Sequence, residues 1–119
     1  MEAHEKVEIV NNYINGVSSQ DMDVIREIFD EQATVEDPFG TNAIVGIEAV
    51  CKFYGEAFAK RVKLESTGPV RCAGNAAVFP FVARTPNREI EVIDIFEFNE
   101  NGKITSMRAY WGPDNYSTL

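Results

Sequence analysis

The sequence predicts an α+β fold in which three helices in the first half of the chain pack into a strongly curved sheet, mixed but mostly antiparallel, formed mainly by the second half. Apolar residues recur with helical spacing up to about residue 58 and alternate with period two after about residue 62, and Gly, Asn and Pro separate the alternating segments. Such an arrangement gives a cone with one open end. With 119 residues, 45% of them hydrophobic, one domain over residues 1–119 is expected.

The helices are predicted from three apolar stripes. The first covers about residues 3–16, with a stripe through Val10, Tyr13, Ile14 and Val17. The second follows Asp21, whose side chain can cap it, and the third begins after Gly46. The inward residues expected for these two helices are Val24, Ile25, Ile28 and Phe29, and then Ile47, Val50, Cys51, Tyr54, Ala57 and Phe58.

A short strand ending at Asp37 is expected between the second and third helices, and consecutive antiparallel strands follow the third. Asn101-Gly102 is the strongest hairpin signal. Pro80 lies inside a strand and has no N–H to donate, so we expect a sheet edge or a bulge there. The later strands are expected at about residues 62–66, 70–73, 76–84, 89–98 and 103–111.

One aspartate breaks the alternation of the strand expected over residues 89–98. Asp94 falls on the apolar face of that strand. A carboxylate in an apolar wall either finds partners or stays protonated, because ionising it there without compensation costs several kcal/mol. Asp94 is thus either a structural acid that accepts backbone hydrogen bonds or a neutral hydrogen-bond donor. The face that it shares carries Ile90, Val92, Phe96 and Phe98.

Two further ionisable side chains point toward the same interior. Asp37 shares a face with Ala33 and Val35, and Tyr13 lies on the inward stripe of the first helix. Each has a structural explanation of its own, because Asp-Pro is common at turns and tyrosines often pack in cores. Three distant segments that each send one ionisable group inward are, however, the arrangement expected of a functional site.

Composition narrows the classes of function. Nineteen acidic and eleven basic residues give a net charge of −8, and no basic stripe is present, so neither nucleic acid nor an anionic membrane is expected as a partner. No segment has the roughly twenty apolar residues of a membrane span, and residues 1–6 do not begin a signal peptide. We expect a cytoplasmic protein.

The inventory of reactive side chains is short. The only histidine is His4, near a terminus expected to be mobile, which argues against Ser/His, Cys/His and histidine-rich metal sites. Cys51 and Cys72 are expected to be reduced and buried, although two cysteines also suffice for one disulfide. No metal and no cofactor is expected, and chemistry here has to use carboxylates and phenols.

A specific combination of segments spans nearly the whole chain: Tyr13, residues 33–40 (ATVEDPFG), Phe53-Tyr54, residues 67–71 (TGPVR), residues 92–94 (VID) and residues 107–111 (MRAYW). In these segments the chain resembles the bacterial steroid Δ5-3-ketosteroid isomerases of the nuclear-transport-factor-2-like (SnoaL-like) superfamily. The resemblance implies the cone-shaped, cystatin-like fold of that superfamily. It also implies a homodimer through the outer sheet face, where Ile93 and Ile95 are apolar candidates.

The resemblance also implies roles for the three inward groups. Asp37 is the implied general base, and Tyr13 and a protonated Asp94 hold the carbonyl oxygen of the substrate. The base moves a proton from C4 of a Δ5-3-ketosteroid to C6 through a dienolate. Positioned acid–base catalysis gives about 10²–10⁴-fold and one oxyanion donor is worth about 3–4 kcal/mol, so the two donors supply the larger part. Ketosteroid isomerase is itself the established example of a carboxylic acid that an apolar site keeps neutral.

Further substrate-binding candidates come from the same resemblance. Tyr54 matches a family tyrosine that donates to the phenol at the position of Tyr13, while Phe29 stands where some members have another tyrosine, so a shorter hydrogen-bond network is expected. The hairpin around residues 85–88 is shorter than in these isomerases, which affects the pocket rim or a dimer contact. The remaining candidates, which by spacing fit a plain core equally well, are Phe53, Phe79, Phe81, Met107 and Trp111.

Two other functions fit the same fold. A non-catalytic protein that binds a steroid, a lipid or a peptide would keep the apolar cone but needs no base with two donors. A polyketide-cyclase-like enzyme acting on another enolisable ketone needs the same three groups, because it also stabilises an enolate. The dehydratases of the superfamily generally use histidine and its epoxide hydrolases an Asp/Arg/Asp set, and no inward arginine is expected in this chain.

Overall fold

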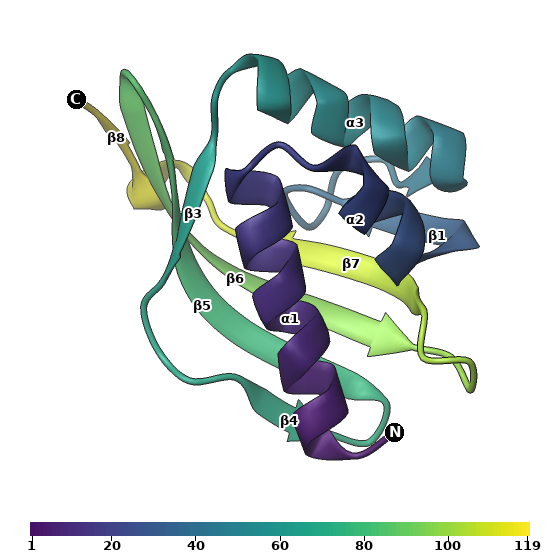
Figure 1. Cartoon of the computed structure of the whole chain (residues 1–119). Helices are drawn as coiled ribbons and strands as arrows, with labels where there is room; N and C mark the ends of the chain where they lie inside the picture. The colour runs from purple at the N-terminus through teal and green to yellow at the C-terminus, as the bar shows by residue number, and fades with distance from the viewer.

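An eight-stranded curved sheet wraps around three helices in the computed structural model, which describes residues 1–119 (Figure 1). The strand order is β2-β1-β7-β6-β5-β3, with β4 paired to β5 and β8 to β6. Only the β1–β7 pair is parallel, which confirms the predicted mixed, mostly antiparallel sheet. The elements are α1 (Ala3–Ser18), α2 (Met22–Ile28), β1 (Phe29–Glu36), β2 (Ile44–Val45), α3 (Ile47–Ala59), β3 (Lys63–Ser66), β4 (Arg71–Ala73), β5 (Ala76–Thr85), β6 (Arg88–Phe98), β7 (Ile104–Tyr110), the 3-10 helix η1 (Pro113–Asn115) and β8 (Tyr116–Thr118).

Strands β3 and β4 differ from the prediction because they do not pair with each other. Both pair with β5, at residues 81–84 and 76–78, so they lie end to end along one edge. Between them four residues face only Phe79 and Pro80. The Pro80 carbonyl accepts from Thr67 N at 3.2 Å, and since N–H and C=O of one strand residue point the same way, the missing N–H of Pro80 faces this gap. The register of β5 with β6 continues through Pro80, so the proline fits the expected sheet edge, here a gap in the edge pairing, and not a bulge; β3 and β4 depart from the expected run of consecutive antiparallel strands.

Several other features differ from the sequence-based prediction. Strand β1 begins at Phe29, which was expected to end the second helix, so Phe29 is buried as a strand residue. Strands β2 and β8, of two and three residues, are too short to show a period and were not expected. His4 lies in the first turn of α1 rather than in a mobile terminus. Cys51 and Cys72 are free thiols, but Cys72 is only half-buried.

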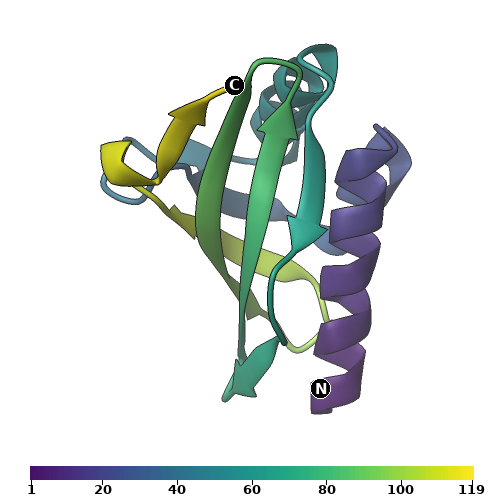
Figure 2. The same ribbon diagram turned by 90° about the vertical axis from the view of Figure 1, so that its left-hand side faces the viewer.

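The β5–β6 hairpin dominates the wall of the cone. It turns through Pro86-Asn87 alone, because Thr85 pairs with Arg88. Figure 2 shows this hairpin with β8 beside β6, and the end of α3 reaches the same end of the molecule. None of the helices is long and apolar enough to cross a membrane.

Helices α1 and α2 approach closely at one glycine. A Cβ added to Gly16 would lie 2.8 Å from Cγ1 and 2.9 Å from Cβ of Val24. Val24 therefore packs directly onto the backbone of α1, one turn after Tyr13 and next to the buried Val17. Asp21 begins α2 as predicted, because its Oδ1 accepts from Asp23 N at 3.0 Å. The contact between Gly16 and Val24 fixes the position of α2 against α1, the helix that carries Tyr13.

Replacing Gly16 with alanine should destabilise the protein. Alanine is favoured over glycine in a helix by about 1 kcal/mol, but overpacking costs typically about 1–3 kcal/mol, and the clash here involves a Cβ that cannot rotate away. Urea denaturation checks the sign. Gly55→Ala in α3 is the matched control, since its added Cβ would meet only Met22 Cε at 3.7 Å and should be neutral or stabilising. Equal effects of the two substitutions would show that the α1–α2 contact is not tight.

Candidate active site

The open end of the cone leads into a cavity of about 350 Å³. Thirteen of its 19 lining residues are apolar, so it suits a hydrophobic ligand. A larger hollow of about 480 Å³ lies near the N-terminus, but only two of its eight lining residues are apolar. Seven of the nine side chains expected at the site line the apolar cavity: Tyr13, Asp37, Phe53, Tyr54, Phe81, Asp94 and Trp111.

Asp94 is buried with no protein partner. It lies in the middle of β6, between Phe79 of β5 and Ala109 of β7 in the strand register, and is 1% exposed. Neither of its carboxyl oxygens makes a hydrogen bond. Burial, and secondarily the charge of Asp37, raises the pKa of Asp94 well above its usual range. A neutral carboxylic acid in this wall offers one O–H donor to a ligand in the cavity.

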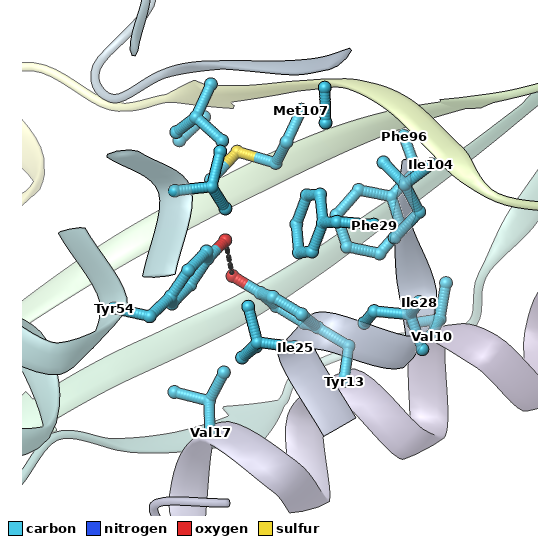
Figure 3. Packing of buried hydrophobic residues seen from close by; sticks show 14 of the residues in the cluster. Val10, Tyr13, Val17, Ile25, Ile28, Phe29, Tyr54, Phe96, Ile104 and Met107 are labelled. Atoms are coloured by element: carbon cyan, nitrogen blue, oxygen red, sulfur yellow. Dashed lines mark hydrogen bonds between the residues drawn. The ribbon is translucent and has the colours of Figure 1, made fainter. Parts of the chain in front are cut away.

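Tyr13 and Tyr54 form a hydrogen-bonded pair beside it. Their hydroxyl oxygens lie 2.9 Å apart, and Figure 3 shows the two side chains meeting from α1 and α3. The edge-on contact between the rings of Tyr13 and Phe96, with centroids 5.0 Å apart, helps to hold Tyr13 in place. Burial is the main cause that raises the pKa of both tyrosines well above 10, so both phenols are neutral. Phe29, 5.7 Å from Tyr54 between ring centroids, has no hydroxyl with which to extend the pair.

Asp37 lies directly after β1, half-buried at the edge of the cavity. Its Oδ1 accepts a hydrogen bond from the Trp111 indole Nε1 at 2.7 Å, a contact that sequence reasoning missed because the two residues are 74 positions apart. Burial raises the pKa of Asp37, and the Trp111 hydrogen bond opposes that rise. Oδ2 has no protein partner, so one oxygen is positioned and the other is available to a ligand.

The aromatic lining is smaller than expected. Phe53 lines the cavity and contacts Tyr54 edge-on at 5.1 Å between ring centroids, and Phe81 also lines it. Phe79 and Met107, by contrast, do not line the cavity as expected, because both lie in the hydrophobic core behind its wall. The reason is packing, because Phe79 is enclosed by the rings of Tyr13, Phe81 and Phe96.

The mouth of the cavity contains charged residues that were not expected. Lys60, at the end of α3, and Arg88, at the start of β6, both line it, as does Tyr116 of β8. The statement that no arginine points inward is therefore wrong. The signal was present, because Arg88 precedes Ile90, Val92 and Asp94 at the same period of two. No set of three His, Cys, Asp or Glu side chains is arranged to hold a metal ion.

This cone-shaped α+β chain is similar to known proteins over most of its length. The family model for the SnoaL-like domain matches residues 10–107. The chain is 34% identical over 108 residues, 87% of each chain, to a steroid Delta-isomerase of Nocardioides simplex. It is also similar, with a TM-score of 0.91, 29% identity and 100% coverage of both chains, to the solved structure of SalBIII, an epoxide hydrolase/cyclase-like enzyme with a role in pyran ring formation in the polyether salinomycin. The chain belongs to the SnoaL-like domain family.

The buried acid should make stability depend on pH. Because burial raises the pKa of Asp94 in the folded state, Asp94 keeps its proton to a higher pH there than in the unfolded chain, which releases it above about pH 4. The contribution of Asp94 to the free energy of unfolding is fully present below the pKa of the unfolded chain. It is lost as pH rises toward the folded pKa, and the loss is up to about 1.4 kcal/mol per pH unit. Asp94→Asn removes this loss. The free energy of unfolding of the variant should therefore increase relative to that of the wild type as pH rises from 5 to 8.

Urea denaturation at several pH values measures this difference. Glu100→Gln is the control, because it removes one carboxylate from an exposed position in the turn after β6. A pH-independent difference for Asp94→Asn would mean that Asp94 is already ionised in the folded protein.

Proposed function

We propose that this protein is a steroid Δ-isomerase that converts Δ5-3-ketosteroids to Δ4-3-ketosteroids. The observation that carries the proposal is Asp94, a fully buried acid without a protein partner in the cavity that Tyr13 and Asp37 also line. A non-catalytic binding protein has no need of such a group, whereas an enzyme that develops negative charge on a carbonyl oxygen does. The relative named as a steroid Delta-isomerase supports the substrate class.

Asp37 is the proposed base. Its Oδ2 abstracts the C4 proton beside the C3 ketone, the electrons move onto the ketone oxygen, and a dienolate forms. The same carboxyl then delivers the proton to C6, which leaves the C4–C5 double bond conjugated with the ketone. Trp111 anchors Oδ1 during both transfers and helps to keep the carboxylate ionised, because its hydrogen bond lowers the pKa that burial raises.

Tyr13 and neutral Asp94 are the proposed oxyanion donors. Both stay protonated at neutral pH, so each can donate to the ketone oxygen as charge develops there. Tyr54 donates to Tyr13 in this arrangement and thereby polarises the Tyr13 hydroxyl toward the substrate. Because the surroundings are apolar, these hydrogen bonds act at a low local dielectric and need no reorganisation of solvent.

The test follows the ultraviolet absorbance of the conjugated enone when the protein acts on 5-androstene-3,17-dione. Asp37→Asn should lower kcat by about 10²–10⁴-fold and Tyr13→Phe by about 10²–10³-fold. Affinity for a Δ4-3-ketosteroid product, read from Trp111 fluorescence, should change far less. Asp23→Asn, at an exposed position of α2, is the control and should turn over like the wild type. Equal losses of turnover and affinity in the two site variants would argue against these roles.

A second candidate is a cyclase-like enzyme that acts on another enolisable ketone. The similarity to SalBIII and the presence of Arg88 at the cavity mouth favour it. Such an enzyme would use the same base and donors, since it also passes through an enolate. Steroid binding without conversion, together with proton exchange beside the ketone of another ligand that is lost in Asp37→Asn, would support this candidate instead.

The isomerase is further proposed to act as a homodimer through the outer face of the sheet. Pro80, Ile93 and Tyr110 lie in one row across β5, β6 and β7, and Ile93 is 47% exposed. Phe39, stacked on Tyr110 with centroids 4.8 Å apart, extends this apolar row. Sedimentation equilibrium should give twice the 13.3 kDa chain mass for the wild type, and the chain mass for Ile93→Glu. A monomeric wild type would exclude the dimer.

A further inference from the structure

We propose that the substrate carries an anionic oxygen group, a carboxylate or a sulfate, at the end remote from its ketone, and that Lys60 and Arg88 bind this group. The inference rests on the proposed function, since it concerns the other end of the same ligand. It identifies a subsite at the cavity mouth, formed by the end of α3 and the β5–β6 hairpin.

The two ends of the cavity differ in chemistry. Asp94 is at the inner end, and Arg88 lies six residues earlier on the same strand and the same face, about 20 Å away for an extended strand. An elongated ligand whose ketone meets Asp94 therefore points its far end toward Arg88. Lys60 and Thr85 line the cavity near Arg88, so the mouth offers polar and cationic side chains where the interior offers mostly apolar ones.

The mouth opens into an adjoining hollow of about 370 Å³. The hollow shares Lys60, Thr85 and Arg88 with the cavity, and Arg61 adds a third cation. None of its seven lining residues is acidic. In a chain of net charge −8, three cations around one opening create a local site that attracts anions.

These cations form no ion pair, in contrast to three of the other arginines of the protein. Arg26, Arg84 and Arg108 each bind a glutamate carboxylate. Lys60 and Arg88 form no ion pair, and Glu56, which lines the cavity one helical turn before Lys60, does not pair with it. The charged end of Arg88 lies 5.5 Å from the centroid of the Tyr116 ring, a cation–π contact that leaves its hydrogen-bond donors available.

A structural explanation accounts for only part of the cluster. Lys60 and Arg61 follow the last turn of α3, where cations interact favourably with the helix dipole. Arg88 belongs to a strand and has no such reason to lie there. Its convergence with Lys60 on one apolar cavity is what a ligand with an anionic end requires, because a planar guanidinium and an ammonium both bind carboxylate and sulfate oxygens.

Matched ligand pairs test the subsite by equilibrium binding, read from Trp111, the single tryptophan, which lines the cavity. The first pair is 3-oxo-4-androstene-17β-carboxylic acid and its primary amide, and the second is testosterone sulfate and testosterone. The wild type should bind at least one anion about fivefold or more tightly than its neutral counterpart, as expected for two partly exposed charge pairs. The advantage should shrink as salt is added.

The variant Lys60→Gln/Arg88→Gln should bring the ratio of anion to neutral affinity close to one. The control Lys52→Gln/Arg71→Gln removes the same charge from exposed positions on α3 and β4 that do not line the cavity, and should keep the ratio. Using the ratio separates the loss of the subsite from a general loss of binding. A preference for only one of the two anions identifies which group the subsite accepts.

Two results would overturn the inference. If anion and neutral partner bind equally to the wild type, or if the ratio survives in Lys60→Gln/Arg88→Gln, these cations do not bind the ligand. Isomerisation of the neutral 5-androstene-3,17-dione tests the proposed function separately, because that diketone has no anionic group. Isomerisation with equal binding would overturn this inference alone, whereas neither isomerisation nor binding of any of the four ligands would overturn both.

Discussion

The burial of Asp94 without a hydrogen-bond partner is the constraint on which the rest of the site depends. An ionised carboxylate at this position would lose its hydration and gain nothing from the protein, so the side chain keeps its proton. The sheet enforces the position, because Asp94 lies in register with Phe79 on one side and Ala109 on the other and cannot turn toward solvent. A group that would be a base at the surface is thereby made a donor.

The other polar groups of the cavity are arranged around that donor. The hydroxyl groups of Tyr13 and Tyr54 form a hydrogen bond to each other at 2.9 Å, and the Trp111 indole N–H donates to one carboxylate oxygen of Asp37. The pKa values of the two aspartates consequently differ although both line one cavity. The fully buried Asp94 has its pKa raised well above the usual range, whereas the Trp111 hydrogen bond and partial exposure hold the rise smaller for Asp37. An acid and a base from the same residue type are what a proton transfer on carbon requires.

The fold of this chain is compatible with more than one enzyme activity. Relatives named as a steroid Delta-isomerase and as an epoxide hydrolase/cyclase-like enzyme share this fold with the chain, so the cone accommodates more than one chemistry. The inner groups determine which reaction the proposed enzyme performs. The residues of the mouth come from the end of α3, a tight hairpin and β8, and such chain ends and turns vary without disturbing the core. Substrate choice is thus expected to reside at the mouth.

The sequence by itself determined the α+β class, the three helices, the long strands and the inward direction of Tyr13, Asp37 and Asp94. These follow from local periodicity, which a single segment carries, and the resemblance to ketosteroid isomerases added the implied roles. Only the tertiary structure decided that Trp111 donates to Asp37, that Phe79 and Met107 lie behind the cavity wall, and that β3 and β4 share one edge of β5. It also decided that Lys60 and Arg88 meet at the mouth. Each of these depends on which segments become neighbours, and the side-chain period of one segment contains no information about its neighbour.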